Sequence, residues 1–171
     1  VITGASSGIG QATAQRLAEL GASVVGVDRN QSDFTCDVTD HVALQRCVEE
    51  TAAKHGRIDI LVNNAATIKV GPLESYSVQD FNEHISTNIR SIFFLIQSAL
   101  PALRESADAA VVNISSTVGS VVKPGNSLYG MTKAAVEYLS RSLALELATD
   151  RIRVNCIASG SVKTPIHLLW A

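Results

Sequence analysis

The stretch VITGASSGIG, residues 1–10, decides the fold of this chain. A short apolar run, VIT, leads into a turn that contains Gly4, Gly8 and Gly10, and the chain continues as GQATAQRLAELG with the apolar spacing of a helix. Glycine adopts backbone conformations that other residues avoid, so it permits an abrupt passage from strand to helix. The stretch therefore predicts a strand, a tight turn and a helix.

The same alternation of apolar runs and helical periods continues along the rest of the chain. The predicted strands cover residues 1–3, 23–28, 33–36, 57–64, 109–115 and 151–158. The predicted helices cover residues 10–21, 41–56, 78–100 and 129–147. Strands that are apolar throughout and alternate with helices are typical of a parallel sheet covered on both faces. We expect one α/β domain over residues 1–171, with a doubly wound, Rossmann-like parallel sheet and helices on both faces.

One connection is too short for this pattern. About five residues separate the second and third predicted strands, whereas parallel neighbours usually need a crossover of about a dozen or more. We expect an irregular crossing here, in place of a helix.

The composition limits the classes of function. The chain has 171 residues, 46% of them hydrophobic, and a net charge of −2. No basic stripe indicates nucleic acid, and the longest apolar runs are too short to span a bilayer. Three cysteines far apart are interpreted as buried reduced thiols, and four histidines without ligand spacing as structural residues, so no metal is expected. These residues are Cys36, Cys47, Cys156, His41, His55, His84 and His167.

The ends of the chain indicate a fragment. It opens at VITG without an initiator Met and closes at HLLWA. We expect it to lack the natural start and a C-terminal substrate-binding segment, and we expect a cytoplasmic protein.

The glycine turn has the chemistry of a phosphate site. Glycines let the backbone approach a pyrophosphate, whose charge meets the free N–H groups and the positive dipole end of the following helix. The spacing is GxxxGxG, which differs from the common GxGxxG. A glycine-rich turn that binds no ligand is the alternative.

Asp28 stands at the end of the second predicted strand. Dinucleotide-binding folds place a carboxylate there that accepts hydrogen bonds from the adenosine ribose. This carboxylate would repel a 2′-phosphate, which favours NAD over NADP. Arg29 beside it offers the opposite possibility, since a guanidinium pairs with a phosphate or stacks on adenine. A plain turn residue is the remaining alternative for Asp28.

Tyr129 and Lys133, in SLYGMTK at residues 127–133, lie four positions apart on a predicted helix. They therefore share one face. A lysine charge about 5 Å from the phenol, at an effective dielectric near 20, favours the phenolate by about 3 kcal/mol, or about two pKa units. This spacing suits a tyrosine that acts as acid or base near neutral pH, although such a pair also occurs on ordinary solvated helix edges.

These motifs together resemble the short-chain dehydrogenase/reductase family over nearly the whole chain. TGxxxGIG is present from Thr3 to Gly10, NNAG appears as NNAA at residues 63–66, and YxxxK spans Tyr129 to Lys133. Asn88 in STNIRS and Ser116 in NISS match two further positions. Where the family has PG after its next strand, this chain has Ser159 and Gly160.

The resemblance implies a set of catalytic and cofactor residues. The implied catalytic residues are Asn88, which orders a water that relays protons to Lys133; Ser116, preferred to Ser115 as the group that holds the substrate oxygen; Tyr129; and Lys133, which also holds the nicotinamide ribose. The implied cofactor contacts are Gly4, Ser6, Ser7, Gly8, Ile9, Gly10, Asp28, Arg29, Asp37, Val38, Asn64, Ala65, Tyr129, Lys133, Gly160, Val162 and Thr164.

The resemblance also implies a reaction and an assembly. We expect an oxidoreductase that transfers a hydride between NAD(H) and a secondary alcohol or ketone, NADP being the less favoured cofactor, and that forms a homodimer or homotetramer. A non-catalytic dinucleotide-binding or scaffold protein of the same fold is the alternative. A nucleotide-sugar epimerase or dehydratase shares YxxxK but usually has a GxxGxxG turn. The substrate is left open.

Overall fold

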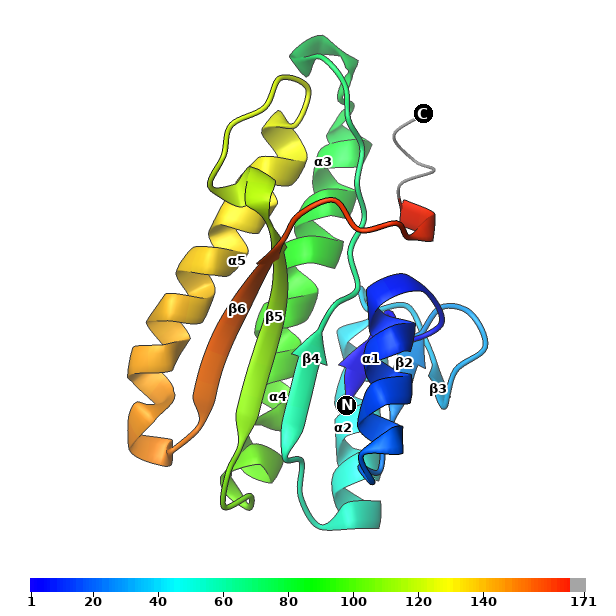
Figure 1. The fold of residues 1–171 in the computed structure, drawn as a ribbon, viewed down its shortest axis with the longest axis vertical. Helices are drawn as coiled ribbons and strands as arrows, with labels where there is room; N and C mark the ends of the chain where they lie inside the picture. Colours follow the sequence, from blue (N-terminus) through cyan, green and yellow to red (C-terminus); the bar gives the residue numbers. More distant parts are fainter. Residues whose placement is uncertain (167–171) are drawn as a thin grey trace.

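Six parallel strands form the centre of the computed structural model, which describes residues 1–166 (Figure 1). The strands lie in the order β3-β2-β1-β4-β5-β6. Their bounds are β1 Ile2–Thr3, β2 Gly26–Asp28, β3 Phe34–Thr35, β4 Ile60–Asn63, β5 Ala110–Ser116 and β6 Arg153–Ser159. This order reverses direction beside β1, as expected for a doubly wound sheet. The predicted fold class is confirmed.

Within residues 1–166, five α-helices connect these strands. Their bounds are α1 Gly8–Glu19, α2 His41–His55, α3 Val78–Ile85, α4 Ser91–Arg104 and α5 Ser127–Glu146. Short 3-10 segments accompany them at η1 Leu73–Ser75, η3 Thr117–Gly119 and η4 Leu147–Asp150, and a π-helical segment at η2 Ser86–Arg90. None of the helices within residues 1–166 is both long and apolar enough to cross a bilayer.

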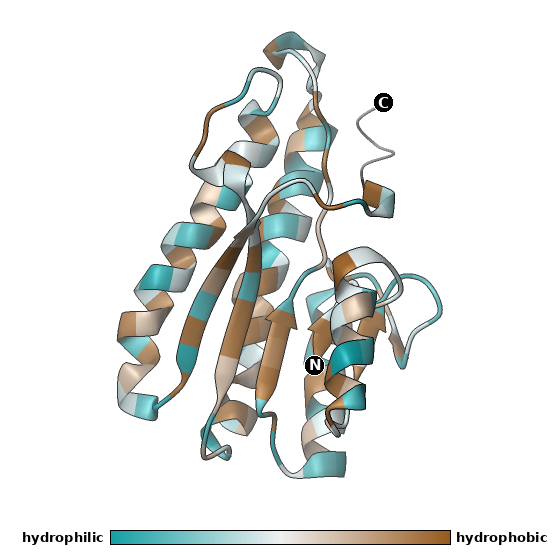
Figure 2. Ribbon diagram, viewed as in Figure 1, coloured by the Kyte–Doolittle hydropathy of each residue, from teal (hydrophilic) through white to brown (hydrophobic). Residues whose placement is uncertain are grey.

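The two faces of the sheet are covered unequally. The chain moves one way from β1 to β2 and the other way from β4 to β6, so right-handed crossovers place α1 on one face and α4 and α5 on the opposite face (Figure 1). The main core joins side chains of α2, α4 and α5 to the strands, among them Leu44, Leu95, Val111 and Val136. The strands are mostly apolar, whereas the helices are mixed (Figure 2). On the face that carries α1, Ile157 of β6 is 53% exposed.

The irregular crossing between the second and third strands is confirmed. Residues 29–33 form bends, yet β2 and β3 pair in parallel, with Val27 opposite Phe34 and Asp28 opposite Thr35. The side chain of Asp33 closes this short path by accepting a hydrogen bond from the N–H of Gly26 at 2.8 Å. The side chain of Asp33 thus anchors this short loop to the sheet.

The predicted helix over residues 78–100 differs in detail. It is divided into α3 and α4 by the π-helical segment η2, and it continues past Pro101 to Arg104. A π-turn inserts an extra residue into the helix without ending it, and apolar spacing does not show such an insertion. The insertion contains Asn88, which is fully buried.

Candidate active site

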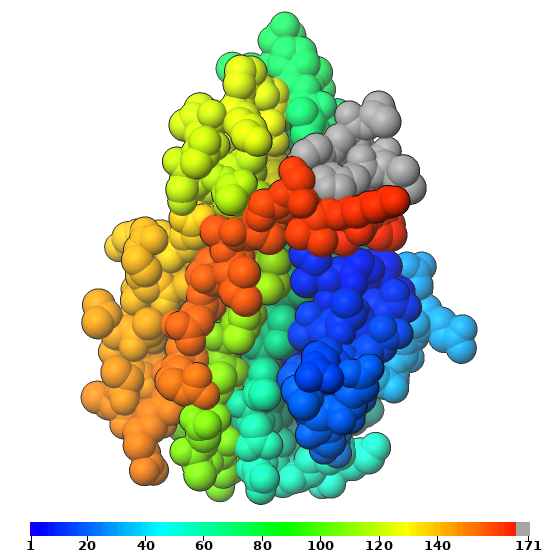
Figure 3. Space-filling model, in the orientation of Figure 1, coloured from blue at the N-terminus to red at the C-terminus, as the bar shows by residue number. Residues whose placement is uncertain are grey.

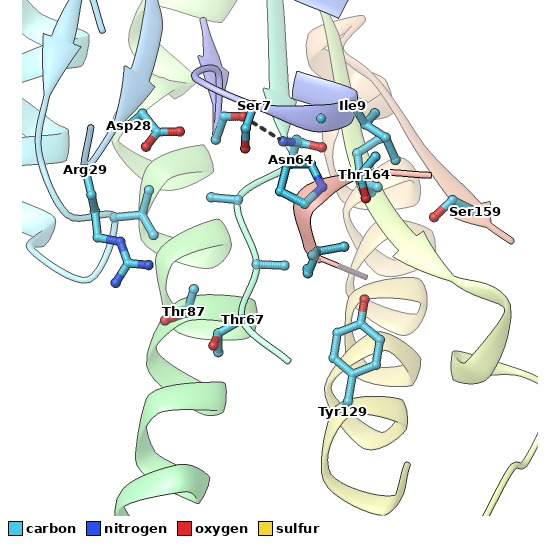
Figure 4. A pocket seen from close by; sticks show the side chains of 18 of the residues that line it. Ser7, Ile9, Asp28, Arg29, Asn64, Thr67, Thr87, Tyr129, Ser159 and Thr164 are labelled. Atoms are coloured by element: carbon cyan, nitrogen blue, oxygen red, sulfur yellow. Dashed lines mark hydrogen bonds between the residues drawn. The ribbon is translucent and has the colours of Figure 1, made fainter. Parts of the chain in front are cut away.

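A cavity of about 420 Å³ lies at the carboxyl ends of the strands (Figure 4). Asp28 and Arg29 lie at one end of it and Tyr129 at the other, and the phenol oxygen of Tyr129 points into the cavity. Of the predicted residues, those that line the cavity are Gly4, Ser7, Gly8, Ile9, Asp28, Arg29, Asp37, Val38, Asn64, Ala65, Tyr129, Lys133 and Thr164. This edge of a doubly wound sheet is where such folds bind ligands.

The glycine turn forms the middle of the cavity wall. Gly4 has a φ of 68°, and a Cβ on it would lie 2.7 Å from Nδ2 of Asn64. The same Nδ2 donates to the carbonyl oxygens of Thr3 at 3.0 Å and Gly4 at 3.2 Å. A larger residue than glycine at position 4 would therefore be strained and would displace the side chain that anchors the turn.

The N-terminus of α1 lacks a side-chain cap. Ser7 occupies the cap position without a side-chain hydrogen bond, and the first turn contains no acidic residue. In contrast, Asp40 caps α2 and Ser77 caps α3. The first N–H groups of α1 are thus left for an anion, and they lie beside the cavity. This arrangement fits the pyrophosphate of a dinucleotide.

Asp28 is held in place at the far end of the cavity. Its carboxylate accepts hydrogen bonds from the backbone N–H of Ser6 at 3.1 Å and of Asn30 at 3.0 Å. Burial raises the pKa of Asp28, but these hydrogen bonds more than offset it, and the pKa lies below its ordinary value. Arg29 turns away from it and lies 3.9 Å from Asp37 in an exposed ion pair. The carboxylate is therefore ionised and available to ribose hydroxyl groups.

Tyr129 and Lys133 lie on one face of α5, as the spacing predicted. Both are buried, and Nζ of Lys133 lies 5.5 Å from the centre of the Tyr129 ring. The ammonium also donates a hydrogen bond to the carbonyl oxygen of Ile114, at 2.8 Å. Helix α5 and strand β5 therefore fix the lysine between them.

The structure does not show the expected lowering of the Tyr129 pKa by Lys133. Burial raises the pKa of Tyr129 to about 12, and the neighbouring Ser116 hydroxyl offsets only part of this rise. Burial also lowers the pKa of Lys133 to about 8. The expectation from sequence counted the attraction between phenolate and ammonium, whereas desolvation of both groups is the larger effect here.

The serine predicted from spacing is the one beside the phenol. Ser116 is half-buried at the end of β5, and its hydroxyl accepts one long contact, 3.5 Å from the N–H of Val118. The hydroxyl of Ser115 points instead to α5, where the carbonyl of Lys133 and the carboxylate of Glu137 lie within 3.1 Å. The hydroxyl of Ser115 is thus engaged with α5, although Ser115 lines the cavity and Ser116 is not among its lining residues. The assignment of Ser116 as the substrate-binding serine stays a prediction.

Asn88 has a different environment from the expected one. Its Oδ1 accepts from the N–H of Thr67 at 2.9 Å, and its Nδ2 donates to the carbonyl of Thr67 at 2.9 Å and to Oγ1 of Thr132 at 3.0 Å. The side-chain amide is thus fully engaged in joining η2 to the loop after β4 and to α5. Asn88 does not line the cavity, and its expected role of ordering a water that relays protons to Lys133 stays a prediction.

Several predicted cofactor residues do not line the cavity. They are Ser6, Gly10, Gly160 and Val162. A Cβ on Gly10 would collide with the backbone of Gly4, so this glycine permits close packing of α1 on β1. A Cβ placed on Gly160 would have no neighbouring atom within 4 Å, and Val162 is 43% exposed. Thr164 does approach, 3.2 Å from a Cβ placed on Gly8, where the segment after β6 crosses the glycine turn (Figure 3).

Sequence reasoning missed other residues of the cavity. They are Asn30, Ala66, Thr67, Glu83, Thr87, Ile114, Ser159, Pro165 and Ile166, with Ser115 as a further lining residue. Six of them lie in the last residues of a strand or within four residues after one, so position along the chain was the available signal. Glu83 and Thr87 instead come from α3 and η2, and they reach the cavity because the helix lies against the loop after β4. Their local sequence contains no sign of this.

None of the cysteines, and none of the histidines within residues 1–166, lines the cavity. Nε2 of buried His84 accepts from the N–H of Lys69 at 3.0 Å, and its Nδ1 lies 2.7 Å from the carbonyl oxygen of Asp80, which is a structural arrangement. No cluster of metal-ligating side chains occurs among residues 1–166, and His167 lies outside them. The cysteines are unpaired, but only Cys47 is buried; Cys36, directly after β3, and Cys156, within β6, are half-buried.

The comparisons with known proteins agree with this geometry. The chain matches the short chain dehydrogenase family over residues 1–168. It is 33% identical to the 3-oxoacyl-(acyl-carrier-protein) reductase FabG of Thermotoga maritima, over 97% of this chain and 74% of that protein.

Two solved structures are similar over nearly the whole chain. A short-chain dehydrogenase from Streptomyces avermitilis has a TM-score of 0.90 and 33% identity, covering 96% of this chain and 66% of that one. A 3-ketoacyl-(acyl-carrier-protein) reductase from Brucella melitensis, complexed with NADH, has a TM-score of 0.93 and 28% identity, covering 98% and 77%. The chain thus spans about two thirds of the Streptomyces protein. It belongs to the short chain dehydrogenase family.

Proposed function

We propose that the protein transfers a hydride between NAD(H) and a secondary alcohol or ketone. One observation carries this proposal: Tyr129 and Lys133 lie at one end of a cavity whose other end contains the Asp28 carboxylate, and the Ser116 hydroxyl lies beside the Tyr129 phenol. An acid/base group and a dinucleotide-binding carboxylate are the two parts that such a reaction needs. Family membership supports the reaction class, and the substrate is not specified by it.

The residues of the cavity fit the cofactor along its length. The uncapped N-terminus of α1 would hold the pyrophosphate, the Asp28 carboxylate the adenosine ribose, and Lys133 the nicotinamide ribose. Asp28 supports NAD over NADP, since its charge opposes a 2′-phosphate, and the Brucella relative was solved with NADH. The nicotinamide ring supplies the carbon that accepts or donates the hydride.

The protein groups would handle the proton. Ser116 holds the substrate oxygen by a hydrogen bond, and Tyr129 takes the hydroxyl proton in oxidation or returns it in reduction. Burial raises the pKa of Tyr129 to about 12 when no cofactor charge lies beside it, and a positive charge near the phenol would lower this pKa. A positively charged nicotinamide beside Tyr129 would act in the required direction.

A spectroscopic assay tests the proposal against a non-catalytic dinucleotide-binding protein. The full-length protein is mixed with NAD and a panel of simple secondary alcohols that includes cyclohexanol, and the absorbance of NADH is followed. We expect binding, seen as a change in cofactor fluorescence, together with turnover of at least one alcohol or of the matching ketone with NADH. Binding without turnover on any member of the panel would favour the scaffold alternative. The cytoplasmic location remains a prediction from sequence.

A further inference from the structure

The turn that follows Ser116 is hydrogen-bonded to helix α5 through the carboxylate of Glu137. The hydroxyl of Ser115 donates to Oε1 of Glu137 at 3.0 Å, and the hydroxyl of Ser120 donates to Oε2 at 2.8 Å. Glu137 lies one helical turn after Lys133, on the side of α5 that faces this turn. The two oxygens therefore bind the chain on both sides of Ser116.

The backbone of the turn is shaped to reach this carboxylate. A Cβ placed on Gly119 would lie 2.7 Å from Oε1 of Glu137 and 3.0 Å from the backbone N of Ala134. A Cβ on Gly130 would likewise lie 2.9 Å from the carbonyl oxygen of Val118. Only residues without a side chain let the turn and the helix approach so closely, so the half-buried carboxylate of Glu137 lies against the backbone of the turn.

The hydroxyl of Ser116 has little to hold it directly. Apart from its contact with the Tyr129 phenol, the hydroxyl accepts only a 3.5 Å hydrogen bond from Val118 among residues 1–166, which is close to the limit for such a bond. Its position relative to Tyr129 is therefore set by the backbone between Ser115 and Ser120. That backbone is held at both ends by Glu137.

We propose that Glu137 is a positioning residue that keeps the Ser116 hydroxyl beside the Tyr129 phenol. The inference rests on the proposed function, because it assigns Glu137 a role through Ser116. Glu137 does not line the cavity and contacts no reacting atom. Its carboxylate accepts two hydroxyl hydrogen bonds at once, and these charge-assisted bonds are stronger than neutral ones. Catalytic geometry is sensitive to displacements of about 1 Å, which such bonds prevent.

A double-mutant cycle in the full-length enzyme tests this role. The variants are Glu137→Ala, Ser116→Ala and their combination, assayed with NAD and the panel alcohol that is oxidised fastest. We expect Glu137→Ala to lower kcat by about tenfold while the Kd for NAD stays unchanged, because the cofactor contacts lie elsewhere. In the Ser116→Ala background, the same change should lower kcat no further, since the residue it positions is absent.

Two more variants separate positioning from general stability. Glu137→Gln should restore most of the activity, because its amide oxygen accepts from Ser115 and its NH₂ group donates to the Ser120 oxygen. Glu146→Ala, on the exposed end of the same helix, is the matched control and should leave kcat unchanged. Equal losses from Glu137→Ala with and without Ser116 would overturn the inference, as would full activity of Glu137→Ala. Activity that Ser116→Ala does not alter would instead contradict the proposed function itself.

Discussion

Tyr129 combines burial with a position at the end of the cavity, so its hydroxyl can be tested separately from its ring. Tyr129→Phe removes the proton-transferring group and keeps the apolar contacts. We expect kcat to fall by about 10² to 10⁴, the usual contribution of one acid/base group, with an almost unchanged Kd for NAD. Steady-state kinetics measures kcat, and isothermal titration calorimetry measures the Kd for NAD. A variant that keeps more than about a tenth of the wild-type rate would show that the phenol is not the catalyst.

Asp28 determines the cofactor preference in our proposal. Its carboxylate accepts hydrogen bonds from the N–H groups of Ser6 and Asn30, so Asp28→Ala removes the charge together with these two hydrogen bonds. We expect the variant to bind NAD more weakly and NADP more tightly. The difference in binding free energy between the two cofactors, on the order of 2 kcal/mol in the wild type, should therefore decrease. Titration of both cofactors gives the ratio of Kd values. Asp33→Ala is unsuitable as a control, because the exposed Asp33 side chain accepts a hydrogen bond from Gly26. Asp108→Ala is suitable, because Asp108 pairs with Arg153 far from the cavity.

Lys133 makes stability depend on pH in a defined window. Burial lowers its pKa from 10.5 to about 8, so between these values the unfolded chain binds a proton that the folded chain does not. Stability contributed by this group therefore rises as the pH increases from about 8 to 10.5 and is lost as the pH falls through about 8. We expect the Tm of wild type relative to Lys133→Met to increase across this window. A constant difference in Tm would mean that the ammonium is not desolvated.

Residue types and spacing predicted the reacting groups but not their electrostatics. The four-residue step placed Tyr129 and Lys133 on one face of α5, and their place in the chain put Asp28 at a strand end. Desolvation depends on how completely β5 and α5 enclose a side chain, and no local pattern contains that information. The same limit applies to Asn88, whose three partners come from segments distant in sequence.

At the scale of elements, Asn88 is the link between η2, the loop after β4 and α5. Asn88→Ala removes its three hydrogen bonds and leaves the buried N–H of Thr67 without a partner. We expect the free energy of unfolding to fall by about 2–4 kcal/mol, measured by urea denaturation. Asn82→Ala, an exposed asparagine on α3, should change it little. Equal stability of the two variants would show that the amide is dispensable to the fold.

The elements themselves were largely predictable because periodicity and chain length determine them. The missing crossover helix between β2 and β3 followed from counting residues, and the structure confirms it. The π-turn in η2 and the passage of α4 through Pro101 were not predicted. Both depend on packing against neighbouring helices, which compensates locally for a displaced or missing backbone hydrogen bond.

At the scale of the whole molecule, α4 and α5 each bury one side in the core and leave apolar side chains on the other. On α4 these are Phe93 and Phe94; on α5 they are Met131, Tyr138 and Leu145, the last two 68% and 82% exposed. They recur along α5 at the spacing of one helix face. Apolar faces of this kind mark association surfaces in soluble proteins. The expected dimer or tetramer, with each helix against its symmetry mate, is thus a prediction about these side chains.

Light scattering on the full-length protein tests this prediction. We expect a dimer or tetramer at micromolar concentration, and we expect Tyr138→Glu to reduce the assembled mass, because a two-fold contact brings the new charge against its own copy. Val42→Glu is the matched control, since Val42 on α2 is 65% exposed yet lies on neither helix. A monomeric wild type would refute the assembly. A wild-type oligomer that Tyr138→Glu leaves intact would place the contact on a surface other than α5.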